Sequence, residues 1–386
     1  MMIRSRLACF LVLGSVACSS EEQPAAQLPR EAGTPDAAVV PHKDAAKDVA
    51  KEAAKPPVKD AGREANVNAD GAQTDAGSPF PNLLSETGLY SDIVKGTLGT
   101  GVRPYEVRYA LWSDGAEKKR WVYIPPGEKI DTTDMDFWKY PVGMKAWKEF
   151  SRGGKRIETR LQYKSGPNPE DWVMMAYQWR SDGSDADAVP LGVVDASGTT
   201  HNIPSAEDCL TCHGNMRDRL LGFNAIQLSH TLPGVKITDL MTENLLTAPP
   251  SGPFTLPGTS EENEALGYLH GNCGDCHNRT SGVFVTVDMQ LWASTKSLDT
   301  VQNMNAYVTA VNQPDPGSSP STRIAPGDPD HSQVWIRMGE PGSSQMPPVA
   351  RETIDTVGRA KIRAWIASMP KLTDGGTDAG GAKDGG

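Results

Sequence analysis

Two identical five-residue patterns constrain this 386-residue chain more than any other feature, because they contain four of its 6 cysteines. The segments Cys209–His213 and Cys273–His277 both read Cys-x-x-Cys-His. Two thiols three positions apart on a helical turn can each form a thioether with a vinyl group of one haem, and the adjacent histidine then lies under the iron. The sequence therefore predicts two covalently bound haem c groups. Their attachment points are Cys209, Cys212, Cys273 and Cys276, and their proximal iron ligands are His213 and His277.

Paired cysteines also occur in zinc sites and in thioredoxin-like redox motifs. The two pairs of a four-cysteine zinc site are usually separated by ~15–20 residues, and the interval from Cys212 to Cys273 is much longer. Zinc would also leave both flanking histidines unexplained. A thioredoxin-like motif belongs to a βαβ pattern, and no such pattern surrounds either segment. Haem attachment is therefore the favoured interpretation.

The N-terminus has the pattern of an export signal. Arg4 and Arg6 precede an apolar run, Leu7–Val16, which is too short to span a bilayer. No other long apolar run is present, which excludes a polytopic membrane protein. The small residues before Cys18 resemble a bacterial lipobox, and this implies cleavage before Cys18, acylation of its thiol and anchoring at the outer membrane or the periplasmic face. The alternative is an ordinary secretory signal; both predict export to an oxidising compartment.

Composition divides the rest of the chain. The segment after Cys18 lacks aromatic residues and is rich in Ala, Pro, Asp, Lys, Glu and Gly, so we expect a disordered tether there and a disordered tail of similar composition at the C-terminus. Strand-like runs dominate the middle, and helix-compatible runs follow them. The expected boundaries are 1–17 for the signal peptide, 18–78 for the lipidated tether, 79–204 for a β-rich domain, 205–260 for a first haem segment, 261–370 for a cytochrome c-like domain and 371–386 for the tail.

The β-rich domain contains short runs of β-branched and aromatic residues separated by polar turns, a pattern typical of an antiparallel sandwich or barrel. In the most regular run, Ile157 and Leu161 alternate with Glu158 and Arg160, so the two pairs belong to opposite faces of a strand. The aromatic side chains are expected to form a core. The expected strands are Val107–Trp112, Arg120–Ile124, Ala146–Phe150, Arg156–Tyr163 and Trp172–Trp179.

Residues 261–369 resemble a class I cytochrome c domain. Glu261–His270 fits the helix that leads into the second motif, and Thr356–Met369 has the apolar stripe of the C-terminal helix. The resemblance implies a sixth iron ligand in the loop before that helix, where Met346 is the candidate and Met338 the rival. A thioether ligand raises the reduction potential relative to a second histidine. The expected fold class is α+β multidomain, with an N-terminal antiparallel β domain followed by an all-α cytochrome c-like dihaem region.

The sixth ligand of the first haem stays open at this point. Residues 205–260 are too few for a complete cytochrome c fold, and Met216 is too close to His213 in sequence to reach the opposite face of the haem. His230 is the leading candidate, because its segment can return across the iron. The alternatives are His201, Met241 and an iron left open or bound by water; His270 and His331 are expected only to make contacts near the second haem.

Three stretches carry a further resemblance together with both haem motifs: Leu111–Asp114, Lys118–Gly127 and Glu158–Leu161. On these stretches, residues 80–369 as a whole resemble a family of bacterial dihaem c-type cytochrome lipoproteins. The resemblance implies no known substrate.

The favoured function is electron transfer between periplasmic or surface redox partner proteins. A formal net charge of -10 supplies no basic face for nucleic acid, so no nucleic-acid partner is expected. Two alternatives remain. One is a dihaem peroxidase or oxidase-like enzyme, which needs an iron with an open or displaceable sixth site. The other is a haem-containing binding module, whose β-rich domain recognises a polymer or a partner protein.

Overall fold

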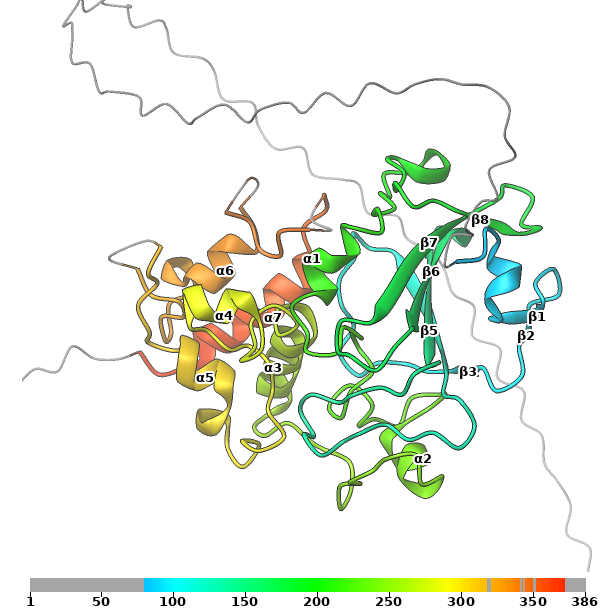
Figure 1. The fold of residues 1–386 in the computed structure, drawn as a ribbon. Coiled ribbons are helices and arrows are strands. Elements are labelled where there is room, and N and C mark those ends of the chain that lie inside the picture. The colour runs from blue at the N-terminus through cyan, green and yellow to red at the C-terminus, as the bar shows by residue number, and fades with distance from the viewer. Residues whose placement is uncertain (1–79, 318–320, 341, 343, 350–351, 372–386) are drawn as a thin grey trace, which may run out of the picture. The chain divides into compact units, whose positions relative to one another are not determined.

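The computed structural model describes residues 80–317, 321–340, 342, 344–349 and 352–371 (Figure 1). The expected signal peptide, the lipidation at Cys18, the tether and the tail after Lys371 lie outside these residues. The described residues all belong to one compact unit. Within this described part, no helix combines the length and the apolar character that crossing a bilayer requires.

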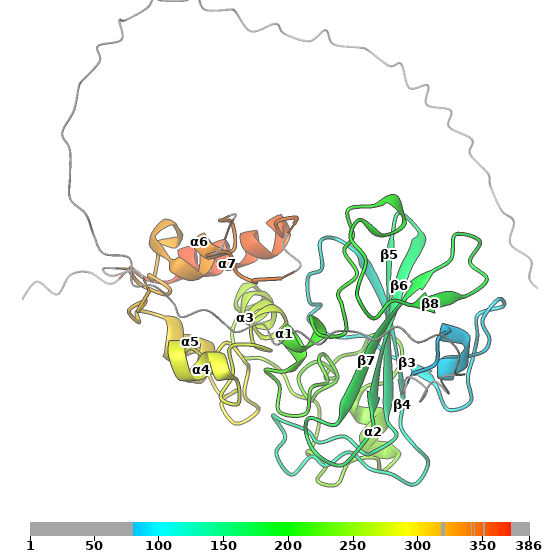
Figure 2. The ribbon, with the colours of Figure 1, turned by 45° about the horizontal axis from the view of Figure 1, so that its top comes forward.

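The main sheet is antiparallel, has six strands in the order β3-β4-β5-β6-β7-β8, and pairs each strand with the next one along the chain (Figure 2). The β5–β6 connection is a tight turn, in which Gly153 and Gly154 adopt φ of 54° and 76°, which a side chain would disfavour. A separate two-stranded sheet joins β1 and β2. The strands are β1 Tyr90–Asp92, β2 Thr97–Leu98, β3 Arg103–Pro104, β4 Glu117–Tyr123, β5 Lys145–Arg152, β6 Lys155–Lys164, β7 Trp172–Trp179 and β8 Ala186–Ala188.

Four of the five expected strands are present, as β4 to β7, but the expected sandwich or barrel is wrong, because the main sheet is open, with β3 and β8 at its edges. One face packs into an apolar cluster that includes Trp147 and Leu161. The other face is covered by loops and short helices rather than by a second sheet; there Val122 and Ala146 pack in a cluster with residues of the 220–246 region.

The strand expected at Val107–Trp112 is wrong. This segment pairs with side chains and loops instead of a strand: the Arg108 amide donates to the Gln227 carbonyl at 2.9 Å, and the Tyr109 amide donates to Oε1 of Gln227 at 2.9 Å. The Trp112 amide donates to Oδ1 of Asn272 at 2.6 Å. The apolar run is therefore a connection between the sheet and the helix that ends at Asn272.

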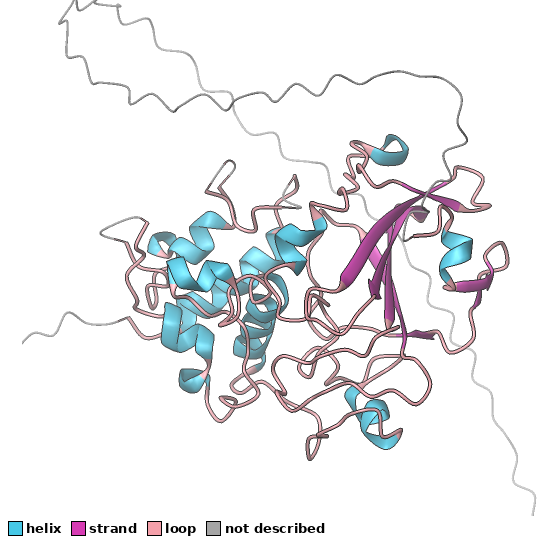
Figure 3. Cartoon of the chain, viewed as in Figure 1, coloured by secondary structure: helices cyan, strands magenta, loops and turns pink. Residues whose placement is uncertain are grey.

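The expected all-α cytochrome c-like region is also wrong. The two expected helices exist as α3 (Ser260–Asn272) and α7 (Thr356–Ser368), and they contact each other. They are the only described helices of seven or more residues; between them lie short helices, loops and isolated bridges (Figure 3). The short helices are α1 Cys209–His213, α2 Ile237–Thr242, α4 Gly282–Val287, α5 Asn305–Ala310 and α6 Gln333–Arg337, and 3-10 turns lie at Leu84–Thr87, Ala196–Gly198, Val301–Asn303 and Pro329–His331.

Proline and glycine explain why the region is mostly not helical. Pro314, Pro326 and Pro329 cannot donate an interior helical hydrogen bond, so each limits helix propagation. Bridges such as that between Val311 and Ile324 pair the backbone instead. The described fold is therefore mostly β, with two antiparallel sheets, and only two of its described helices have seven or more residues.

Glycine permits the close approach of α3 and α7. A Cβ atom on Gly358 would lie 2.1 Å from the Tyr268 ring, so only glycine fits at this position on α7. At the neighbouring residue Gly267, a Cβ atom would lie 1.9 Å from the ring of Tyr109, in the connection described above. The connection from the sheet therefore also packs closely on α3.

Candidate functional site

The first Cys-x-x-Cys-His segment is the short helix α1. One helical turn places Cys209 and Cys212 near each other on the same side of the helix. Both thiols are free and half-buried. Cys212 packs against an apolar cluster that includes Phe137, Leu221 and Trp292. The Cys212 thiol therefore lies in an apolar environment.

The second segment begins where α3 ends. Thr259 caps the start of α3, since its Oγ1 accepts from the Glu262 amide at 3.3 Å and Glu262 Oε2 accepts from the Thr259 amide at 2.8 Å. Cys273 is the C-terminal cap, and the His277 amide donates to the Cys273 carbonyl at 2.8 Å. The thiols of this segment are also free. A capped helix therefore sets the position of the second thiol pair.

The structure brings the two segments side by side. Asn215, two residues after the first motif, donates from Nδ2 to Sγ of Cys276 at 3.7 Å and accepts at Oδ1 from the Ser281 hydroxyl at 2.8 Å. In return, Nδ2 of Asn278 lies 3.4 Å from the Asn215 carbonyl and 3.6 Å from the sulfur of Met216. Each motif is thus followed by an asparagine: Asn215 contacts the second motif, and Asn278 contacts the two residues 215 and 216 after the first. Sequence reasoning did not predict this contact, and neither asparagine carries a local signal of it.

The two motif histidines are buried and neutral. Burial lowers the pKa of His213 to about 3 and that of His277 to about 4, so at neutral pH each imidazole is uncharged and has one ring nitrogen without a proton. Nδ1 of His213 lies 2.6 Å from the Arg219 carbonyl, and its Nε2 lies 3.0 Å from the Gln162 amide nitrogen. Nδ1 of His277 is buried and has no hydrogen-bond partner among the described residues. An iron ligand needs this neutral form.

The four thiols are protonated at neutral pH. Burial raises the pKa of Cys212 to about 11 and those of Cys273 and Cys276 to about 12, and it raises the pKa of Cys209 as well. Thiolates are the form that oxidises readily or binds zinc. A thioether forms when the S–H of a reduced thiol adds across a vinyl group, so the cysteines must be free rather than joined in disulfides. The donor set therefore fits covalent haem.

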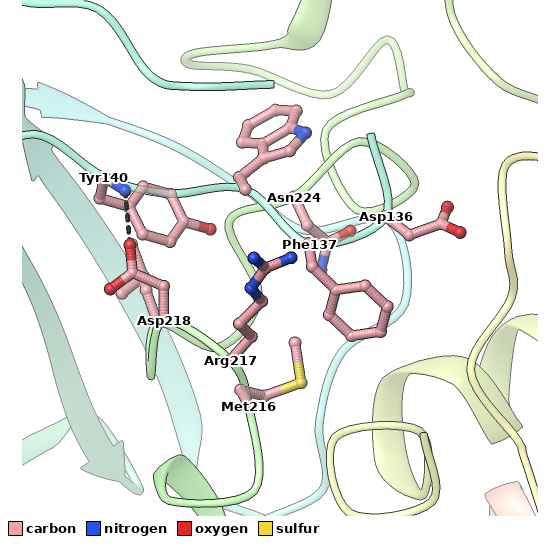
Figure 4. Close-up of a pocket in the computed structure, with 9 residues that line it drawn as sticks. Asp136, Phe137, Tyr140, Met216, Arg217, Asp218 and Asn224 are labelled. Atoms are coloured by element: carbon pink, nitrogen blue, oxygen red, sulfur yellow. Dashed lines mark hydrogen bonds between the residues drawn. The ribbon is translucent and has the colours of Figure 1, made fainter. Parts of the chain in front are cut away.

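Space around the motifs is small. One cavity, lined by Met216, Phe137 and Asp218 among others, lies directly after the first motif (Figure 4). Another touches Asp275 of the second motif and Lys148 of β5. Neither approaches the size of a porphyrin, so attachment requires the side chains packed around the motifs to move apart.

The two histidine candidates for the sixth ligand are hydrogen-bonded to other groups, and three methionine candidates pack in apolar clusters. Nε2 of His230 lies 2.9 Å from the Glu106 carbonyl and its Nδ1 accepts from the Leu232 amide at 3.1 Å, so both ring nitrogens are occupied and no described contact joins it to the first motif. Nε2 of His201 lies 2.6 Å from Oε1 of Glu158. The remaining candidates are Met216, which packs with Phe137; Met241, which packs on the same apolar cluster as Cys209; and Met338, which is buried in the cluster against which Cys273 packs.

Met346 is half-buried, and its amide donates to the Arg337 carbonyl at 2.9 Å. No described contact joins it to His277. Its role as a sixth ligand stays a prediction.

His270 is buried on α3, three residues before the second motif, while His331 is on the surface. Nδ1 of His270 accepts from the Ala293 amide at 3.2 Å, and its Nε2 has no partner among the described residues. The ring packs edge-on against Trp292 with 4.3 Å between centroids. His270 is thus a packed core histidine.

His270 predicts a pH dependence of stability. Burial lowers its pKa to about 3, so below about pH 6.5 the unfolded chain takes up a proton that the folded chain does not. We expect the free energy of unfolding to decrease as the pH is lowered through that range, by up to about 1.4 kcal/mol per pH unit from this group. Urea unfolding at pH 7, 6 and 5 measures the free energy of unfolding, and its dependence on pH should be weaker in His270→Gln than in the wild type. The control, His331→Gln, removes a histidine that is 81% exposed; equal slopes in both variants would contradict the prediction.

Sequence reasoning did not predict that the polar side chains on one face of β6 lie beside the first motif. The face of β6 that carries Glu158, Arg160 and Gln162 is covered, since Gln162 contacts His213 and the Arg160 guanidinium lies near the Cys209 thiol. Glu158 is fully buried and accepts two hydrogen bonds from Arg160, at 2.9 and 2.6 Å. The alternation of the strand was visible in the sequence, but what covers its charged face was not.

Comparisons of the chain with protein-family models, with curated proteins and with solved structures find no match. The resemblance to dihaem lipoproteins therefore stays a prediction. Across the described ranges, no group of three or more His, Cys, Asp or Glu side chains is arranged to hold a metal ion.

Proposed function

We propose that this chain is an exported dihaem c-type cytochrome that transfers electrons between redox partner proteins and is tethered to a membrane through a lipid on Cys18. One observation carries the proposal: the second Cys-x-x-Cys-His segment contacts, through Cys276, the residue Asn215, which lies two positions after the first segment and far from the second in sequence. Electron transfer slows steeply with distance, so adjacent attachment points favour a relay.

The chain's own residues have defined roles in this proposal. The thiols of Cys209, Cys212, Cys273 and Cys276 would hold the haems, and the neutral imidazoles of His213 and His277 would bind iron. When bound, haem supplies an iron that cycles between ferric and ferrous states. The apolar residues around Cys212 would exclude water and thereby limit the reorganisation that accompanies each change of charge. The net charge of -10 favours partners with a basic docking patch.

The experiment that tests this function uses the full-length protein produced in a host that attaches haem c. Intact-mass analysis should show the polypeptide plus two haems, and a redox titration followed in the Soret region should show two reversible one-electron steps. Carbon monoxide and peroxide should leave both spectra unchanged. A bare polypeptide mass would overturn the proposal, and fast reaction of one haem with peroxide would replace it with the peroxidase function.

Met346 gives a further expected outcome. If its thioether binds the second iron, Met346→Ala should lower the potential of one haem, by a shift on the order of 100 mV, because axial ligands alone move haem potentials over about 0.8 V. The same redox titration measures this shift. Met338→Ala is the matched control, and an equal shift in both variants would contradict the assignment of Met346.

A further inference from the structure

Three cations lie directly opposite one another on three neighbouring strands. Arg120 of β4 pairs in register with Lys148 of β5, and Lys148 pairs with Arg160 of β6. Directly opposed side chains point to the same face of a sheet with Cβ atoms ~5 Å apart. We call these three residues the cation row. Like charges in this arrangement destabilise a sheet, so fold stability alone does not explain the row.

The cation row faces the first motif. Cys209 packs against the apolar cluster that contains Val122 and Ala146, and these two residues lie two positions from Arg120 and Lys148 on the same face of the sheet. Gln162, two residues after Arg160 and on the same face of β6, contacts His213. The row is therefore next to the point at which two thioethers would fix a porphyrin.

The carboxylates already present leave the row incompletely neutralised. Arg160 is paired with Glu158, and Arg120 lies 3.4 Å from Oε2 of Glu106. The ammonium of Lys148 makes no hydrogen bond or ion pair with any of the residues that the structure describes. Lys148 and Arg120 both line the cavity that Asp275 of the second motif also lines, and no hydrogen bond or ion pair joins either cation to that carboxyl group.

We propose that the cation row binds the carboxylates of the haem attached at Cys209 and Cys212, its two propionates. This inference rests on the proposed function and extends it by naming the residues that hold the acidic edge of the first haem. Arg and Lys form short, charge-assisted hydrogen bonds with carboxylates. A cation held there also favours the ferrous iron, which has one positive charge fewer than the ferric iron.

The test is a redox titration of the purified dihaem protein and of Lys148→Gln. We expect one of the two potentials to fall, with the reduction equilibrium constant of that haem decreasing about tenfold, equivalent to about 59 mV for one electron. Lys148→Arg keeps the charge and should keep the potential. The matched control is Lys119→Gln, which removes a 71% exposed lysine from the other face of β4 and should leave both potentials unchanged.

A second variant and a second ligand make each outcome decisive. Arg120→Gln should lower the same potential, so the inference is still tested if Lys148→Gln does not fold. Equal potentials in Lys148→Gln, Arg120→Gln and Lys119→Gln would overturn the inference while the two haems stay attached. A saturable shift of the wild-type potential on adding inorganic phosphate, absent in Lys148→Gln, would also overturn it in favour of a free anion. A polypeptide without haem would remove the proposed function itself.

Discussion

Replacing Cys209 and Cys212 together with alanine is expected to remove one haem of the proposed cytochrome and to leave the other attached. The reason is covalent: in the proposed function these thiols are the two attachment points on α1, and the second pair belongs to a separate segment at the end of α3. We expect the intact mass to fall by one haem, and the haemochrome absorbance per polypeptide to fall to about half. Cys273→Ala with Cys276→Ala should give the same loss for the other haem.

The control for this experiment is Thr211→Ala. Thr211 lies between the two thiols on α1 and is exposed, and its backbone carbonyl, which the substitution keeps, accepts from Asn215. Both haems should remain. Two haems in the Cys209→Ala/Cys212→Ala variant, or none in wild type, would contradict the assignment of the motifs.

Replacing Asp218 with alanine should lower the free energy of unfolding far more than breaking an exposed ion pair does. Asp218 pairs with the ammonium of Lys164, which is 1% exposed, and accepts from the Trp172 indole at 2.8 Å and from the Tyr140 amide at 2.6 Å (Figure 4). Removing one partner of a buried ion pair leaves a buried charge without compensation and costs about 3–5 kcal/mol. Denaturant unfolding followed by circular dichroism measures this loss.

Two further variants separate the buried pair from a general effect of charge. Glu243→Ala breaks an exposed pair with Arg103 and should cost at most about 1 kcal/mol. Lys164→Met combined with Asp218→Leu removes both buried charges and should recover most of the stability lost in Asp218→Ala. A loss in Asp218→Ala no greater than that in Glu243→Ala would refute the argument.

This pair also explains how the first motif is held. Asp218 follows His213 by five residues, and its contacts with β6 and β7 fix the segment after α1 to the sheet. The His213 ring is fixed from the same segment by the Arg219 carbonyl. We therefore infer that stability and the orientation of His213 are linked at this position.

Local patterns identified the longest regular elements, those of seven or more residues among the described part of the chain. β4 to β7, α3 and α7 all fall where alternation or helical spacing predicted them, since both periodicities are properties of contiguous residues. The same reasoning failed for Val107–Trp112, because an apolar run with strand-like composition has no strand to pair with and bonds to Gln227 instead. It also failed for the expected all-α region. Helices at both ends of that region led to the expectation of helices between them, where prolines limit helix length.

The sequence by itself determined the chemistry available to this protein: two thiol pairs with adjacent histidines, because covalent attachment depends on spacing within five residues. Only the tertiary structure decided that Asn215 reaches Cys276, and that Arg120, Lys148 and Arg160 form one row beside the first motif. Those contacts join segments tens of residues apart, and the path of the chain through the open sheet, which no local pattern encodes, brings them together.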